Sequence, residues 1–311
     1  MANPTIQTNA NGIVSSEILE LIVLGNQAVE KGVIKIIPGV QDKIELPRMS
    51  ISDNIIQDRD ATPSNSVGTL ARTGRTITPL DGMVYYRFNP RMFETDWREF
   101  QPKGRFPDKV TNPKMLKAMM SVTKKSINNQ IGNLIWSGDI TAGAASPLRF
   151  FNGLVTIAAA DAEVIDVTNI GVITKANVIA VFEAVRNSIP DAILDQQNLR
   201  FHISTAVKRL YQDAVRELSF KGSDPTTTTA SLFMDIEVID FSGFPANTVY
   251  AAVSSTGSDS NFYAAVDMAG DEDNIKMQQY RPESEEWFAK ALFKMATNIA
   301  WPQETVLYQG S

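Results

Sequence analysis

A long polar stretch between two strand-like segments is the feature that most limits how this chain can fold. The flanking segments are Ile44–Ile51 and Thr76–Phe88, and the polar middle is Gln57–Arg75. The only sizeable apolar side chains of that middle are Val67 and Leu70, too few to form a buried face. A two-stranded ribbon is marginally stable by itself in water. The stretch is therefore either a disordered surface loop or an arm that lies on a neighbouring subunit.

The overall composition is that of an ordinary globular protein. The chain has 311 residues, of which 43% are hydrophobic and 21% charged, and its formal net charge is −6. A chain of this length buries roughly 75% of its unfolded surface, which is enough for one large core or two. The acidic balance argues against tight sequence-independent binding to DNA, because such binding needs Lys and Arg to displace counterions.

Cysteine and histidine usage removes the commonest metal and nucleophile chemistry. The sequence has no Cys and a single His, His202. It therefore offers no disulfide, thiolate metal site or Cys nucleophile, and too few His for a His-built zinc site or triad. The lack of Cys fits a reducing cytosol. No apolar run reaches the ~20 residues of a membrane span, and the N-terminus lacks the pattern of a signal peptide.

One amphipathic helix dominates the first half of the chain. Apolar side chains recur through Lys114–Trp136 at helical spacing, which predicts a helix of ~30 Å or slightly more. The apolar stripe consists of Leu116, Met120, Ile127, Ile131 and Leu134. Four lysines lie off the stripe, on a face expected to be solvated, with weak polyanion contact as the alternative: Lys114, Lys117, Lys124 and Lys125. Gly138–Pro147 ends the helix, and Phe150–Ile157 is predicted to begin a new strand.

The central third predicts a compact α/β unit. Ile173–Ile189 has an apolar helical face that ends at Pro190. Leu199–Ile203 alternates apolar and polar residues like a half-buried strand, and Ser204 can cap the helix that follows. Further strands are predicted at Ile236–Phe241, Thr248–Val253 and Asn261–Val266. Glu285–Tyr308 predicts one long final strand, or a strand pair, that returns to an earlier sheet.

The segments outside these units are simpler. Met1–Gly12 is polar and is predicted to be a mobile arm. Ser15–Gly25 predicts a short helix, and Val33–Ile37 a strand ended by Pro38–Gly39. Pro102–Pro113 is a proline-punctuated linker.

Three groups of residues could carry chemistry, but each has a simpler explanation. Gly68 and Gly74 are separated by one residue more than the two glycines of a P-loop. Arg75 also stands where a P-loop has its Lys. His202 falls in a predicted strand, where a structural hydrogen bond is favoured over a general base. The carboxylates of Asp267, Asp271, Glu272 and Asp273 could gather a calcium ion, but their spacing does not match an EF-hand loop. Gly270–Asn274 fits a hairpin turn better. We therefore predict no catalytic, cofactor-binding or metal-binding residues.

The order of the segments resembles one known family. The helix is followed by Phe151-Asn-Gly-Leu154, and later by the strand-to-helix unit Phe201-His-Ile-Ser204. A Gly-Phe-Pro turn at Gly243–Pro245 and the strand Asn261–Asp267 precede the long C-terminal strand. In this order and spacing the chain resembles, over most of residues 33–308, the major capsid proteins of tailed bacteriophages, which have the HK97-like fold.

The resemblance implies an α+β, HK97-like capsid fold in four parts. These are an N-terminal arm and first strand at 1–43, an extended E-loop hairpin at 44–88, a P-domain at 89–160 and 281–311 with its spine helix at 114–136, and an A-domain at 161–280. The stretch ahead of the E-loop is too short for the large scaffolding segment that some members carry. We therefore expect a separate scaffolding protein or none.

The family's function is structural and not enzymatic. The resemblance implies self-assembly into the hexamers and pentamers of an icosahedral phage head that encloses double-stranded DNA, contacted non-specifically. It implies a place in the virion after assembly in the host bacterial cytoplasm. Scaffolding, portal and decoration proteins are further candidate partners, and no membrane is involved.

Two alternatives remain open at this point. The first is an encapsulin-like bacterial compartment, which has the same fold and encloses an enzyme. The second is a soluble α/β enzyme or ligand-binding protein that uses the carboxylates of Asp267–Asp273.

Overall fold

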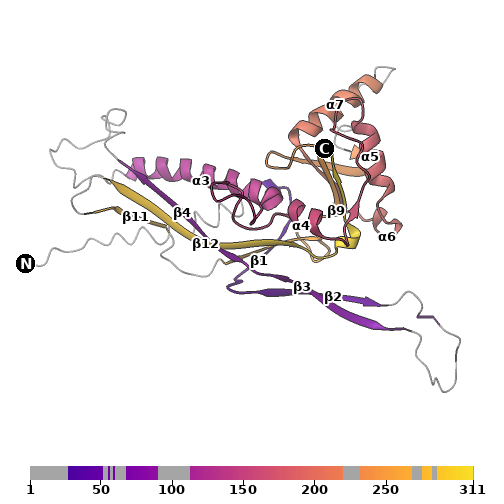
Figure 1. Cartoon of the computed structure of the whole chain (residues 1–311), viewed down its shortest axis with the longest axis horizontal. Helices are drawn as coiled ribbons and strands as arrows, with labels where there is room; N and C mark the ends of the chain where they lie inside the picture. Colours follow the sequence, from indigo (N-terminus) through magenta and orange to yellow (C-terminus); the bar gives the residue numbers. More distant parts are fainter. Residues whose placement is uncertain are drawn as a thin grey trace, which may run out of the picture.

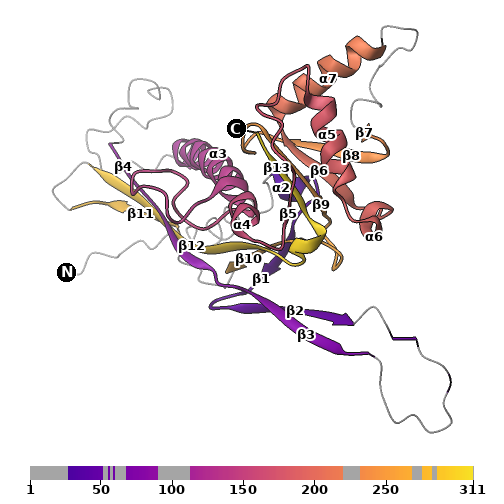
Figure 2. The same ribbon diagram turned by 45° about the vertical axis from the view of Figure 1, so that its right-hand side comes forward.

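The computed structural model describes residues 27–51, 55–56, 59, 68–89, 113–219, 232–267, 275–281 and 286–310. These residues form three sheets, and the two-stranded one projects away from the others in both Figure 1 and Figure 2. The predicted arm, Met1–Gly12, and the predicted helix, Ser15–Gly25, lie outside the described residues, as does the linker up to Pro113. Within the described ranges, no helix has the length and apolarity needed to cross a membrane.

The longest sheet is organised around one strand, β12. The five strands are β1 (Lys35–Pro38), β4 (Leu80–Phe88), β10 (Phe262–Asp267), β11 (Ile275–Gln279) and β12 (Trp287–Ile299). β4 pairs antiparallel with one edge of β12, so that Leu80 lies opposite Met295. β10 and β11 pair antiparallel with the other edge, and β1 pairs parallel with β10. The predicted strand at Val33–Ile37 is thus confirmed as β1.

β10 and β11 follow one another along the same edge of β12. β10 pairs with the C-terminal part of β12 and β11 with its N-terminal part, and both run in the same direction. The hairpin turn predicted at Gly270–Asn274 is therefore wrong, because a hairpin would place the two strands antiparallel and adjacent. Residues 268–274 themselves lie outside the described ranges.

Two helices, α3 (Pro113–Ser137) and α4 (Leu154–Ala160), cover one face of the long sheet. Figure 1 shows α3 running alongside β4 and β12. Ile127, Ile131 and Leu134 of the predicted stripe are buried, and Lys125 is exposed, which confirms the predicted helix. The side chains of Leu116, Met120, Lys114, Lys117 and Lys124 lie outside the described ones.

The strand predicted at Phe150–Ile157 is wrong, since residues 154–160 form α4. Its β-branched side chains favour a strand, but Leu154, Val155 and Ala158 fall on one helical face and are buried in the core around α3. Gly153 precedes the helix where the chain crosses the end of α3. A Cβ atom there would lie 2.6 Å from the carbonyl oxygen of Trp136, so the crossing requires glycine.

The second sheet has six strands in the order β5-β13-β9-β6-β8-β7. Their bounds are β5 (Ile165–Asp166), β6 (Leu199–Ser204), β7 (Leu232–Phe233), β8 (Ile236–Phe241), β9 (Thr248–Val253) and β13 (Val306–Gln309). The helices of this unit are α5 (Val178–Asn187), α6 (Asp191–Leu194) and α7 (Thr205–Ser219). The predicted central helices and strands are confirmed, with the first helix shorter than Ile173–Ile189. The strand at Leu199–Ile203 is not half-buried as predicted, because its second face, which carries His202, is also buried.

Both faces of the six-stranded sheet are covered. In β9, Val249, Ala251 and Val253 pack in the core formed with α5 and α7. The alternate residues, Tyr250 and Ala252, pack in the core around α3. This alternation follows from the period of two along a strand, and it joins the two larger sheets through a shared core.

The two larger sheets do not coincide with the ranges predicted for the A-domain, 161–280, and for the last part of the P-domain, 281–311. β10 and β11 come from the first range but belong to the five-stranded sheet, and β13 comes from the second but belongs to the six-stranded one. The predicted segment Glu285–Tyr308 is accordingly a strand pair. Its two strands, β12 and β13, are separated by a 3-10 turn at Pro302–Glu304 and lie in different sheets.

The third sheet is an antiparallel pair that we call the ribbon. It consists of β2 (Ile44–Ile51) and β3 (Leu70–Ile77), with Ile51 opposite Leu70. The single strand predicted at Thr76–Phe88 is wrong: its first two residues end β3, and β4 leaves to join the long sheet. Pro79 lies between them and cannot donate a ladder hydrogen bond, which explains the break.

Candidate assembly surfaces

The two faces of the ribbon have different surroundings. The cross-strand register places Leu46, Arg48, Arg75 and Ile77 on one side, which we call the body-side face because it packs on the rest of the subunit. The opposite side, the free face, carries Met49, Ile51, Leu70 and Arg72.

The free face carries large apolar side chains in contact with water. Leu70 is 68% exposed, Met49 65% and Ile51 56%. Ile56, which follows β2, is 90% exposed. Exposed apolar side chains gathered on one face mark an interaction site, and unpaired strand edges are templates for pairing with another chain. The ribbon is therefore suited to contact another molecule.

A second exposed surface lies on the long sheet, opposite α3. We call it the open face, and it carries Met83, Tyr85 and Arg87 of β4 with Phe288 and Leu292 of β12. Met83 lies opposite Leu292, and Arg87 opposite Phe288. Met83, Leu292 and Tyr85 are all among the exposed large apolar side chains.

Arg87 contacts two tyrosines at the open face. Its Nε donates a hydrogen bond to Tyr85 Oη at 2.9 Å, and its guanidinium carbon lies 3.9 Å from the ring centre of Tyr280. The rings of Tyr85 and Phe288 are 6.0 Å apart. Tyr and Arg are enriched among the residues that supply most of the energy at protein interfaces, and Phe is enriched in interface composition. The open face is a second candidate contact surface, on the long sheet, which extends from the base of the ribbon in the opposite direction (Figure 1).

His202 has a structural position, as predicted. It is buried between the two larger sheets, with Nδ1 3.0 Å from the Tyr250 carbonyl and Nε2 3.0 Å from Ser254 Oγ. Since a carbonyl can only accept, Nδ1 carries the proton and Nε2 accepts from the serine. Burial, only partly opposed by the Tyr250 bond, lowers the pKa of His202 to about 3. An imidazole with that pKa is a poor general base at neutral pH.

The other residues considered for chemistry form no site among the described residues. Gly74 and Arg75 lie in β3, so they do not form a phosphate-binding loop. Asp267 ends β10, while Asp271, Glu272 and Asp273 lie outside the described residues. In the parts of the chain that the structure describes, no group of three or more His, Asp or Glu side chains is placed to hold a metal ion.

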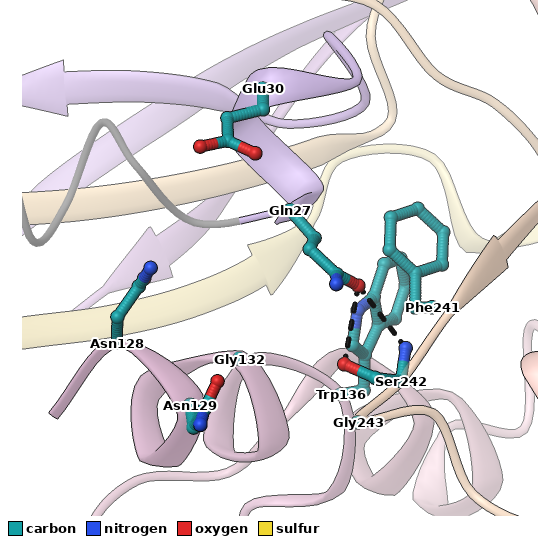
Figure 3. Close-up of a pocket in the computed structure, with 9 residues that line it drawn as sticks. All are labelled: Gln27, Glu30, Asn128, Asn129, Gly132, Trp136, Phe241, Ser242 and Gly243. Atoms are coloured by element: carbon teal, nitrogen blue, oxygen red, sulfur yellow. Dashed lines mark hydrogen bonds between the residues drawn. The ribbon is translucent and has the colours of Figure 1, made fainter. Parts of the chain in front are cut away.

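A cavity of about 210 Å³ lies between α2 (Gln27–Glu30), α3 and the turn after β8 (Figure 3). Gln27 Oε1 accepts hydrogen bonds from the N–H and Oγ of Ser242, both at 3.2 Å, and so ties α2 to that turn. The lining is mainly amides and backbone, with Glu30 as its one ionisable side chain. It contains no acid–base pair of the kind that catalysis needs.

The open face was not identified from the sequence. Along β4 both alternating sets contain large apolar residues, with Val84 and Tyr86 on one side and Met83 and Tyr85 on the other. The alternation therefore reveals a strand but not which side α3 covers. The sequence does single out the polar stretch Gln57–Arg75, because it has too few apolar side chains for a core of its own, although its last residues, from Leu70, belong to β3.

Comparison with known proteins identifies the fold through structure and not through sequence. No protein-family model matches the chain, and no curated protein sequence matches it. Among solved structures, that of the satellite phage P4 procapsid including the size determination (Sid) protein is similar over 94% of this chain and 98% of the other. Its TM-score is 0.59 at 11% identity.

Two further structures are similar over comparable lengths. A chain in the structure of Mycobacterium phage Cain is similar over 89% of this chain and 88% of its own length. The TM-score is 0.54 at 13% identity. A chain in the structure of a virus-like particle from Pyrococcus furiosus is similar over 96% of this chain and 98% of its own length. The TM-score is 0.52 at 9% identity. The chain therefore has the α+β, HK97-like fold of capsid proteins, as predicted from its segment order.

Proposed function

We propose that this protein is the major capsid protein of a tailed bacteriophage, a structural subunit whose copies form the hexamers and pentamers of an icosahedral head. The observation that carries the proposal is the free face of the ribbon. Met49, Ile51 and Leu70 are exposed there, and none of the described residues covers them. A second copy of the chain would complete what the subunit leaves uncovered.

The ribbon and the open face are two different surfaces of the molecule. A contact between unlike surfaces is heterologous, and its repetition generates rings when the rotation closes. We infer that the ribbon of one copy lies on the long sheet of the next, where Met83, Tyr85 and Leu292 are exposed. Many such modest contacts would make a shell far more stable than a single interface.

The parts of the subunit receive family roles within this proposal. The ribbon corresponds to the E-loop, although β4 is not part of it. The five-stranded sheet with α3 corresponds to the P-domain and its spine helix. The six-stranded sheet with α5 and α7 corresponds to the A-domain. The boundaries proposed now follow the sheets, with β10 and β11 in the P-domain and β13 in the A-domain.

The proposed contents and partners follow from the same role. The head would enclose double-stranded DNA, contacted weakly and non-specifically because the net charge is −6. Scaffolding, portal and decoration proteins are further proposed partners. Assembly would take place in the host bacterial cytoplasm.

An encapsulin-like compartment is the second candidate. The similarity to the virus-like particle from Pyrococcus furiosus, which covers nearly all of both chains, favours it. Nucleic acid content separates the two: a phage head produced in infected or induced host cells contains nuclease-protected double-stranded DNA, whereas a compartment contains protein cargo.

The proposal is tested with two neighbouring substitutions that add the same charge on opposite faces of the ribbon. Leu70→Asp changes the free face, and Ala71→Asp changes an exposed position on the body-side face. We expect the unsubstituted protein and Ala71→Asp to form closed particles in negative-stain electron microscopy, and Leu70→Asp to remain as folded small species.

Two results would contradict the proposal. An unsubstituted chain that stays monomeric or a small fixed oligomer at high concentration would favour the ligand-binding alternative. Normal particles from Leu70→Asp would show that the free face is not a shell contact.

A further inference from the structure

Two arginines leave the ribbon on the same side and reach the same turn of the subunit. Arg48 belongs to β2 and Arg75 to β3, and both lie on the body-side face. Both meet the turn Asp161–Glu163, which directly follows α4. The contacts join a projecting element to the main body at two points.

The contact of Arg75 is the closer of the two. Its Nη1 lies 2.6 Å from Asp161 Oδ2, and the two side chains are only 21% and 16% exposed. Burial raises the pKa of Asp161, but the hydrogen bond from the Glu163 N–H and the contact with Arg75 outweigh it and hold the pKa below its usual value. The carboxylate therefore stays charged, and a charged pair with little access to water is attracted more strongly than one at the surface.

Arg48 reaches three groups of the main body. Its Nη1 donates to the carbonyl of Ala300 at 3.0 Å and lies 3.7 Å from Glu163 Oε2. Its guanidinium carbon is 5.1 Å from the ring centre of Trp301. The Glu163 side chain is 53% exposed, so the carbonyl and the ring contribute more to this position than the ion pair does.

The turn that receives the arginines is itself fixed. Asp161 ends α4, where its N–H donates to the Ala158 carbonyl, and its Oδ1 accepts from the Glu163 N–H at 3.0 Å. The Asp161 carboxylate is thus held by a backbone bond that does not depend on Arg75.

Among the described residues, Arg48 and Arg75 make the outermost contacts between the ribbon and the rest of its own subunit. Leu46, level with Arg75, and Ile77, closer to the body, are buried against β10 and the end of β12. Farther out, Met49 to Ile51 and Leu70 to Thr73 are exposed. A change of angle at Arg48 and Arg75 would therefore move the entire exposed part of the ribbon.

We propose that Arg48 and Arg75, bound to the turn Asp161–Glu163, form a clamp that sets the angle at which the ribbon leaves the subunit. The clamp orients the free face before another molecule arrives and so reduces the ordering cost of that contact. Arg75 and Asp161 are its main positioning residues. Only the consequence for shell assembly rests on the proposed function; the clamp itself does not.

The orientation of the ribbon can be measured with two spin labels. The chain has no Cys, so Ser50→Cys on β2 and Gln197→Cys after α6 introduce unique labelling sites at exposed positions. Labelled full-length protein is diluted with unlabelled protein so that only distances within one subunit are recorded by double electron–electron resonance. With the clamp intact we expect one narrow distance peak.

Two sets of substitutions open the clamp from opposite sides. Asp161→Asn with Glu163→Gln removes the two negative charges, and Arg75→Gln removes the guanidinium of the closer ion pair without touching the end of α4. We expect each to widen the distance distribution at least two-fold, while circular dichroism stays unchanged. Asp81→Asn, which breaks the exposed ion pair with Lys294 at the start of β4, is the control and should leave the width unchanged.

A variant in which the two charges are exchanged tests whether the ion pair itself orients the ribbon. A general loss of stability would not be reversed by such an exchange. Arg75→Asp combined with Asp161→Arg should narrow the distribution again relative to Arg75→Asp alone. A width that stays narrow in both opened variants, or widens equally in Asp81→Asn, overturns the clamp and leaves the shell proposal standing. An unsubstituted protein with a narrow peak that forms no particles overturns the shell proposal and leaves the clamp standing.

Discussion

The six-stranded sheet and the ribbon are both built from alternating strands, but they differ in what covers their faces. β9 buries all six of its residues, three in the core with α5 and α7 and others in the core around α3. The ribbon buries only Leu46 and Ile77 near its root, and its free face is exposed. Strand pairing alone thus does not make a self-sufficient unit; the covering layers do.

The largest expected effect is a difference in unfolding free energy between two truncations. One removes an aromatic ring from the six-stranded sheet and its helices, which we call the sheet unit, and the other shortens a side chain on the ribbon. Phe182 of α5 is fully buried, and its ring centre lies 5.1 to 5.3 Å from those of Phe201, Tyr211 and Phe233. Phe182→Ala should lower the free energy of unfolding of the unassembled subunit by about 3–5 kcal/mol, because it leaves a cavity in a packed core. Urea denaturation followed by tryptophan fluorescence measures it.

The ribbon counterpart is Leu70→Ala in the same unassembled subunit. Since Leu70 is 68% exposed, the change in unfolding free energy should stay within about 0.5 kcal/mol. A loss similar to that of Phe182→Ala would mean that the subunit itself covers the free face, and the contrast between the regions would disappear.

The same contrast explains what could be predicted from the sequence. The helix face of Val178, Val181, Phe182 and Val185 and the strand at Leu199–Ile203 follow local periods, and both elements are found. The strand, however, is buried on both faces and not on one as predicted. The polar stretch that ends in β3 was singled out by its lack of apolar residues, which is also a local property. Which face of the ribbon is free, and which residues of the turn after α4 receive its arginines, depend on tertiary packing that no local period encodes.

The errors have a related cause. The strand predicted at Phe150–Ile157 followed β-branched propensity, but burial against α3 decided for a helix. The hairpin predicted at Gly270–Asn274 followed turn composition, but both flanking strands pair with β12, the strand that follows them in the chain. Contacts with another helix or strand, and not the local pattern, decided both outcomes.

A second prediction concerns acid sensitivity within the sheet unit. The pKa of His202 is about 3 in the folded protein, against ~6.5 for an unfolded histidine. The native state therefore binds fewer protons, so the stability that this group contributes is present above pH 6.5 and is lost as pH falls towards 3. Between pH 7.5 and 5 the free energy of unfolding should fall by about 2 kcal/mol from this group alone.

His202→Gln supplies the control, because His202 is the single histidine of the chain. That variant should be less stable throughout but nearly flat between pH 7.5 and 5, a range above most of the titration of Asp161 and Asp240, whose pKa values are lowered. Equal slopes for the two proteins in urea titrations would show that the imidazole is not buried as described.

The smallest expected effect is the loss of one helix cap, again compared between the two regions. Ser204 ends β6, and its Oγ accepts a hydrogen bond from the N–H of Val207 in the first turn of α7 at 3.3 Å. Ser204→Ala should cost about 1 kcal/mol of unfolding free energy, because the N–H of Val207 loses its acceptor.

Ser50→Ala on the ribbon removes the same hydroxyl from an exposed position of β2. It should change the unfolding free energy by less than about 0.5 kcal/mol. The ratio of the two changes therefore distinguishes a serine that caps a helix from a serine that only faces water. If Ser204→Ala were as mild as Ser50→Ala, the junction of β6 and α7 would be held by packing of Val207 and Tyr211 alone, and the sheet unit would owe its stability to its covering layers even at its helix ends.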